Sequence, residues 1–258
     1  MRALTPAGGQ HAGRTVVVDG RSVSLDEVRT LFNNGELGEA DDREQLVLDA
    51  LLQHAPDASR LLDAGCYTGR FLKQASAVLP SCQLFGIDSS LDHVVICHAL
   101  YPELADFTSQ MSAYRLGFAD GVFDCVTFQE VIEHLDRPVD AVREINRVLR
   151  LGGLLVLSTP NANAAAWRLM LSSLKSRLLG RGGYRPAGNA IYFENVPWNR
   201  HLYSWTPVTL NTLLLVNGFE YVSHYFFHDN ALGRVLPELG AGMVFVVRKV
   251  CTSPRTLV

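Results

Sequence analysis

Short apolar runs alternate with amphipathic stretches along most of this chain. The apolar runs are rich in Leu, Val, Ile and Phe and are bounded by Gly, Pro, Asn or Asp, which is typical of buried strands. In the stretches between them, apolar residues recur every three or four positions, which is the period of a helix that buries one face. The pattern predicts strands at residues 60–64, 83–88, 107–112, 123–129 and 154–159, and helices at residues 70–79, 90–101 and 138–150.

Strands that alternate with helices are typical of a parallel sheet covered by helices on both faces. Towards the C-terminus, Thr206 and Pro207 form the start of a helix that is predicted to end at Gly218. Two β-rich runs follow, Glu220–Phe227 and Met243–Val250, with no long helix between them. The sequence therefore predicts an α/β fold, with a doubly wound, mostly parallel seven-stranded sheet and an antiparallel edge strand.

The N-terminal residues have a pattern of their own. Residues 1–14 are rich in Gly, Ala and Pro and are predicted to be disordered. A short hairpin that turns at Asp19-Gly20 is predicted next, followed by a helix that a capping box begins at Ser24. We expect residues 1–40 to be an extension of the chain and residues 41–258 to be the main domain, which begins with a helix over residues 41–54.

A long insertion, residues 161–205, separates the fifth strand of the core from the Thr206 helix. It is rich in Arg, Lys, Trp and Tyr, and insertions of this length are often lids or binding segments. It is predicted to be a lid insertion. Its composition fits three interpretations. It could be a solvated surface loop or a lid that excludes water from an acceptor, or its Trp167–Arg181 segment could contact a membrane surface or an anionic substrate.

Composition narrows the class of protein. The chain has 258 residues, of which 48% are hydrophobic, and this is ample for a packed core. The net charge of −3 argues against nucleic acid as a partner. No apolar run has the length of a bilayer span, and no secretory signal pattern is present. The five cysteines form no C-x-x-C pair. We therefore expect a reduced, cytoplasmic location.

A glycine turn follows the first core strand and carries the clearest chemical signal. Asp63, Gly65 and Gly69 frame the turn, and Asp88 ends the next strand. Glycines let a ligand approach the backbone closely, and an acid at the end of the second strand suits the two hydroxyls of a ribose, although it would also suit a helix cap. Tyr67 stands where a pyrophosphate would need bare backbone, so the expected ligand is a nucleoside without a pyrophosphate.

These motifs resemble those of class I S-adenosylmethionine-dependent methyltransferases. The turn and Asp88 match the first two motifs of that family, and two later segments, Phe123–His134 and Leu149–Thr159, match its fourth and fifth strands in the right order. The resemblance covers roughly residues 45–250. It implies a Rossmann-like fold for the main domain and S-adenosyl-L-methionine as the cofactor.

The resemblance also implies which residues contact the cofactor. Asp63 would lie near its amino group and Asp88 would bind both ribose hydroxyls. The family often has an Asp facing the adenine where this chain has Ser112-Ala113, so the backbone there is the expected substitute. The full set expected at the cofactor is Asp63, Gly65, Tyr67, Gly69, Asp88, Ser89, Ser112, Ala113 and Gln129.

A second group of polar residues follows the fourth core strand. Glu130, Glu133 and His134 are spaced i, i+3 and i+4, so in a helix all three would project from one face and could bind a cation. Together with His201, the segment resembles the small-RNA 3′-end 2′-O-methyltransferases, in which the matching residues hold a divalent metal. It is also similar to the ubiquinone-pathway O-methyltransferases. These resemblances imply a site for Mg²⁺, Mn²⁺ or Zn²⁺.

The same acid and histidine pattern occurs in small-molecule methyltransferases without an established metal. In that case Glu130 would lie near the sulfonium, and His134 or His201 would be the base. The expected catalytic residues are therefore Glu130, His134 and His201. The other histidines show no partner pattern and are expected to be structural or on the surface: His11, His54, His93, His98, His224 and His228.

The expected activity is transfer of a methyl group from S-adenosylmethionine to the hydroxyl of a small molecule. N-methylation of a small molecule and 2′-O-methylation of RNA remain alternatives within the enzymes, and the lack of an added RNA-binding domain counts against RNA. A regulatory module that binds the cofactor without catalysis is the alternative from a different class. The sequence does not determine the acceptor or the oligomeric state.

Overall fold

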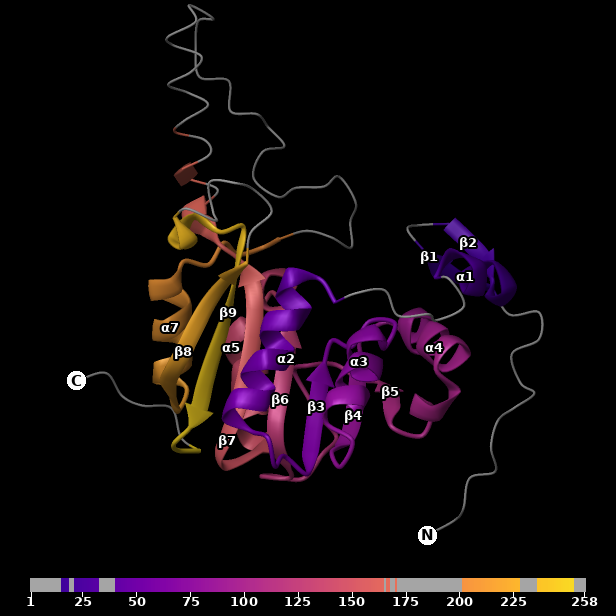
Figure 1. Ribbon diagram of the computed structural model, residues 1–258, viewed down its shortest axis with the longest axis horizontal. Coiled ribbons are helices and arrows are strands. Elements are labelled where there is room, and N and C mark those ends of the chain that lie inside the picture. The colour runs from indigo at the N-terminus through magenta and orange to yellow at the C-terminus, as the bar shows by residue number, and fades with distance from the viewer. Residues whose placement is uncertain are drawn as a thin grey trace, which may run out of the picture.

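The computed structural model describes residues 15–18, 21–32, 40–164, 166–167, 170, 201–227 and 236–252. Seven strands form one sheet in the order β5-β4-β3-β6-β7-β9-β8 (Figure 1). The first five of these strands are parallel, and β9 is antiparallel to both of its neighbours, so the antiparallel strand lies next to the edge strand β8. The strands are β3 (Arg60–Ala64), β4 (Gln83–Asp88), β5 (Thr108–Gln110), β6 (Phe123–Gln129), β7 (Leu149–Pro160), β8 (Phe219–Phe227) and β9 (Gly242–Lys249).

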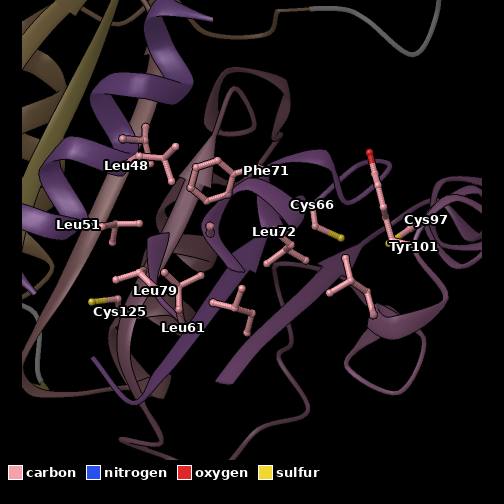
Figure 2. Packing of buried hydrophobic residues seen from close by; sticks show 14 of the residues in the cluster. Leu48, Leu51, Leu61, Cys66, Phe71, Leu72, Leu79, Cys97, Tyr101 and Cys125 are labelled. Atoms are coloured by element: carbon pink, nitrogen blue, oxygen red, sulfur yellow. The ribbon is translucent and has the colours of Figure 1, made fainter. Parts of the chain in front are cut away.

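Helices cover both faces of this sheet, as expected for a doubly wound fold. One face packs against α2 (Asp42–His54), α3 (Arg70–Val78) and α4 (Leu91–Leu100), and Figure 2 shows part of this cluster. The other face packs against α5 (Pro138–Val148) and α7 (Pro207–Val216). The predicted α/β fold is confirmed.

Neighbouring residues in each strand contribute to opposite faces. Leu61 packs with the α2 face and Leu62 with the α5 face, and in β7 the side chains alternate in the same way from Leu154 to Leu157. The cause is the two-residue period of side chains along a strand. Both faces are apolar, so the strands read as continuous hydrophobic runs. The same alternation determines which way the polar residues at the strand ends point.

The N-terminal residues form a small unit that packs on α4. Strands β1 (Thr15–Val18) and β2 (Arg21–Ser24) pair antiparallel, and α1 (Leu25–Leu31) follows, with a capping box between Ser24 and Glu27. Val16 and Val28 are buried in the same cluster as α4, and the amide of Val17 donates a hydrogen bond to Asp92. The predicted turn at Asp19-Gly20 and the predicted disorder of residues 1–14 lie outside the described residues.

Two elements differ in extent from their predicted ranges. β5 is shorter than predicted, and β7 begins at Leu149 directly after α5, with a register shift against β6 between Phe123 and Cys125. Of the predicted lid insertion, residues 171–200 lie outside the description, and so does most of the Trp167–Arg181 segment. Within the described residues, no helix has both the length and the apolar character needed to cross a bilayer.

Candidate functional site

The glycine turn links the carboxyl end of β3 to α3. Gly65 and Gly69 have φ angles of 95° and 80°, in the left-handed region that favours glycine, and Tyr67 adopts φ 49° there as well. The amides of Gly65 and Cys66 both donate to the carbonyl of Ile87, at 2.7 and 2.8 Å. These bonds tie the turn to β4, so it lies beside the carboxylate of Asp88.

Both glycines also lie against neighbouring side chains. A Cβ on Gly65 would come within 2.4 Å of Val131 Cγ2, and a Cβ on Gly69 within 2.4 Å of Cys97 Sγ. Gly65 therefore allows the segment after β6 to pack on the turn, and Gly69 allows α4 to do so. The tight turn and the close approach of Val131 bring the carboxyl ends of β3 and β6 together at one place.

Asp88 is buried and accepts hydrogen bonds on both carboxylate oxygens. Its Oδ2 accepts from the amide of Tyr67 at 3.0 Å, and its Oδ1 accepts from the amide of Ser90 at 2.8 Å. The Nδ1 atom of His93 lies 3.1 Å from Oδ1. The His93 ring also packs edge-on against the Tyr67 ring, with centroids 4.3 Å apart. No pattern in the sequence predicted His93 at this site.

Asp63 is buried at the end of β3 and accepts a hydrogen bond from Thr127 Oγ1 at 2.7 Å. Burial raises the pKa of its carboxyl to about 7, although hydrogen bonds from Thr127 and Gln129 and the positive charge of Arg43 lower the pKa in part. A nearby ammonium would favour the ionised form of such a group. This arrangement fits the expected role of Asp63 beside an amino group.

The expected adenine side lies past the end of β4. Ser89 is exposed, and its carbonyl accepts from the Gln110 side chain at 3.0 Å. Ser112 is also exposed and its hydroxyl accepts from the amide of Tyr114, whereas Ala113 is half-buried against the α5 face. The amide of Met111 bonds to the carbonyl of Asp88, so this loop borders Asp88. Adenine recognition by these residues stays a prediction.

The segment after β6 is not the α-helix that the i, i+3, i+4 spacing anticipated. Glu130 has a φ of 51°, and only a short 3₁₀ turn, η3 (Ile132–His134), follows it. The amide of Glu130 donates to the carbonyl of Ser158. This hydrogen bond holds the left-handed Glu130 beside the carboxyl end of β7. Glu130, Glu133 and His134 therefore do not share one helical face.

Glu130 and Glu133 are held by adjacent residues of β7. Ser158 Oγ donates to Glu130 at 2.8 Å, and Thr159 Oγ1 donates to Glu133 at 2.9 Å. Adjacent strand residues point to opposite faces, so Ser158 lies on the α2 side and Thr159 on the α5 side. The Glu130 carboxylate consequently lies on the same side of the sheet as Asp63, and the Glu133 carboxylate lies on the other side.

Glu133, His134 and His201 do come together. Each offers a ligand atom, and these three atoms lie within 4.8 Å of one another. The rings of His134 and His201 meet edge-on with centroids 4.7 Å apart. The carbonyl of Glu133 accepts from the amides of Leu202 and Tyr203, which holds the residues after the insertion against η3.

The carboxylate of Glu133 lacks a full set of partners. Its Oε1 is buried and accepts no hydrogen bond in the part of the chain described, and His134 Nε2 lies 3.8 Å away. Burial, followed by the charge of Glu130, raises the pKa of Glu133 to about 8. Burial also raises the pKa of Glu130. A buried, incompletely bonded carboxylate beside two imidazoles fits a site that a proton or a cation would complete.

Other residues of the site were not anticipated from the sequence. Thr127, Ser158 and Thr159 could have been predicted, because a hydroxyl at the end of an otherwise apolar strand can be recognised in the sequence. Arg43 lies at the start of α2, where its side chain pairs with Asp41 at 3.3 Å. Its charge lowers the pKa of Asp63, Glu130 and Glu133, and no feature of the sequence points to this influence.

Comparison with known proteins identifies the family of this chain. The methyltransferase domain family matches residues 40–224. An uncharacterised 37.1 kDa protein of a Streptomyces fradiae transposon is 34% identical over 61% of this chain and 48% of its own length. A ubiquinone biosynthesis O-methyltransferase of Xanthomonas oryzae is 32% identical over 53% of this chain and 61% of its own length. The chain thus spans about half to three-fifths of the length of these curated relatives.

Solved structures share the fold at lower identity. The [4+2]-cyclase SpnF has a TM-score of 0.56 at 18% identity and covers 88% of this chain and 94% of its own. A SAM-dependent methyltransferase from Thermotoga maritima also has a TM-score of 0.56 at 18% identity, over 87% of this chain and 96% of its own. The family match covers most of the chain, the fold agrees, and the motifs that carry the resemblance lie at the carboxyl ends of the strands. The chain belongs to the methyltransferase domain family and has the fold of the class I S-adenosylmethionine-dependent methyltransferases.

Proposed function

We propose that this protein transfers the methyl group of S-adenosylmethionine to a hydroxyl of a small molecule, beside a divalent cation held by Glu133, His134 and His201. The observation that carries the proposal is the buried Oε1 atom of Glu133, which accepts no hydrogen bond among the described residues and lies beside both imidazoles. The curated relatives named as O-methyltransferases support transfer to oxygen.

The residues fit a cation better than they fit simple packing. A packed carboxylate would be expected to satisfy both oxygens, because an unpaired buried polar atom costs about 1–3 kcal/mol. One carboxylate and two imidazoles suit Mn²⁺ or Zn²⁺ at least as well as Mg²⁺, which prefers oxygen ligands. A divalent cation bound there would lower the pKa of an acceptor hydroxyl and orient it.

The cofactor would be held on the other side of the strand ends. Asp88 would accept from the ribose, Asp63 would pair with the amino group, and Arg43 is the cation available for the carboxylate of the same cofactor. In this arrangement the methyl group leaves the sulfonium sulfur as the acceptor oxygen forms the new bond, and the hydroxyl proton passes to a base. The base in this proposal is Glu130, whose carboxylate lies apart from the proposed cation ligands. Its raised pKa suits a carboxylate that accepts the hydroxyl proton.

The test uses metal binding and turnover together. Mn²⁺ binding is followed by electron paramagnetic resonance in the wild type, Glu133→Gln, His201→Gln and the matched control Glu130→Gln. We expect the first two variants to lose the bound signal and the control to keep it. Methyl transfer from labelled S-adenosylmethionine is then assayed on a catechol, a primary amine and a short RNA, with and without chelator.

We expect methylation of the catechol that chelator abolishes and Mn²⁺ restores. Methylation of the amine or the RNA in place of the catechol would refute the acceptor class. Turnover that survives chelation, or Mn²⁺ binding that survives Glu133→Gln, would refute the cation site and leave His134 or His201 as the base. Cofactor binding without methylation of any acceptor class would favour a regulatory module.

A further inference from the structure

Asp88 has fewer acceptor positions available than a ribose needs. A carboxylate has about four lone-pair positions, two on each oxygen. Oδ1 already receives the amide of Ser90 and the ring of His93, and Oδ2 receives the amide of Tyr67. A ribose that donates one hydroxyl to each oxygen needs a position on Oδ1, and both positions there are taken.

Of these three partners, only the side chain of His93 can leave without unfolding the turn. The amides of Tyr67 and Ser90 are part of the backbone: the first belongs to the glycine turn and the second to the N-cap of α4. His93 lies on the first turn of α4 with its side chain 32% exposed, so its ring has solvent to move into. It packs edge-on against Tyr67, which is itself exposed.

We infer that His93 occupies the place of one ribose hydroxyl on Asp88 and must leave it when the cofactor binds. The inference rests on the proposed use of S-adenosylmethionine and deepens it, because it makes His93 a residue that regulates access to the ribose position. His93 is then a competitor for Asp88, and its removal should tighten cofactor binding. A residue that only supported Asp88 would have the opposite effect.

The groups that face His93 are the Asp88 carboxylate at the end of β4 and the Tyr67 ring from the glycine turn, while its neighbour Asp92 accepts from Val17 in β1. The competition is therefore between the His93 ring and a ribose hydroxyl for one oxygen of Asp88.

The experiment is calorimetric titration of the full chain with S-adenosylhomocysteine. The variants are His93→Leu and His93→Phe, of which the second keeps a ring against Tyr67 but cannot bond to Asp88. The control is His224→Leu, which removes a histidine that bonds to Tyr221 on β8. Thermal unfolding of each variant shows that it is folded.

We expect both His93 variants to bind about threefold or more tightly than the wild type, on the scale of one net hydrogen bond. The control should bind with the affinity of the wild type. In the background of Asp88→Ala, His93→Leu should have no further effect, because the acceptor has been removed.

Two results would overturn the inference. These are unchanged or weaker binding in both folded His93 variants, or an equal gain from His93→Leu in the Asp88→Ala background. If the wild type binds no S-adenosylhomocysteine, the proposed function fails instead. The two failures are therefore distinguishable.

Discussion

Thr159 donates a hydrogen bond of 2.9 Å to Oε2 of Glu133, and this bond orients a buried carboxylate towards two histidines. The preceding residue of β7, Ser158, makes the equivalent bond to Glu130 on the other side of the sheet. Two acids that are three positions apart in the sequence are thereby held on opposite sides of the sheet. The role proposed for each acid can be tested through the hydroxyl that holds it.

Thr159→Val should weaken Mn²⁺ binding by roughly tenfold or more, because it removes the group that orients Glu133, the proposed ligand. Ser158→Ala is the matched control, since it removes the equivalent hydroxyl from Glu130 and should leave Mn²⁺ affinity near that of the wild type. Titration of Mn²⁺ followed by electron paramagnetic resonance gives both affinities. Equal losses in the two variants would contradict the division of the acids between the two sides of β7.

Asp88→Ala should weaken binding of S-adenosylhomocysteine by about 2–3 kcal/mol, because it removes the buried acceptor of the ribose hydroxyls. Asp92→Ala is the control, since this acid lies four residues further along and bonds instead to the amide of Val17. Isothermal titration calorimetry of the two variants provides the comparison. Unchanged affinity in Asp88→Ala would remove this residue from the cofactor site.

Gly65→Ala should lower both the free energy of unfolding and the affinity for S-adenosylhomocysteine. The added Cβ would lie 2.4 Å from Val131 Cγ2, so the segment that carries Glu130 and Glu133 must shift. Gly152→Ala separates this contact from backbone strain, because Gly152 also has a left-handed φ, 79°, but a Cβ there meets nothing within 4 Å.

Gly152→Ala should therefore lose only about 1–2 kcal/mol of stability, the cost of a Cβ on a left-handed residue, and keep its affinity for the ligand. Urea unfolding and calorimetry measure the two quantities. If Gly65→Ala loses no more stability than Gly152→Ala and binds normally, the contact with Val131 does not matter to the site.

Asp63 should make the protein less stable as the pH rises. Burial raises its pKa from 3.8 to about 7, so between these values the folded state holds a proton that the unfolded state has lost. The free energy of unfolding then decreases with rising pH, by at most about 1.4 kcal/mol per pH unit for this one group, and the decrease ends once the pH exceeds about 7.

Asp63→Asn cannot ionise, so its free energy of unfolding should rise relative to that of the wild type as the pH increases from about 5 to about 8. Urea unfolding at several pH values gives both curves. Parallel curves for the two proteins would show that Asp63 titrates with the same pKa in the folded and unfolded states.

The order of the core elements and the family follow from the sequence because they depend on local patterns. Apolar strands, capped helices and the turn at Gly65 and Gly69 can be recognised from neighbouring residues alone. Asp63 and Asp88 could be predicted to lie near each other for the same reason, since the carboxyl ends of parallel strands meet at one edge of the sheet.

Tertiary structure decided the contacts that depend on register and on backbone conformation. The spacing of Glu130, Glu133 and His134 suggested one helical face, but a left-handed Glu130 and the alternation of Ser158 and Thr159 separate the two acids. His201 reaches Glu133 because the backbone amides after the insertion bond to the Glu133 carbonyl. His93 faces Asp88 because the Ser90 cap begins α4 immediately after the β4 carboxylate. These relations join residues through strand pleat and turn geometry, which the order of residue types along the chain does not encode.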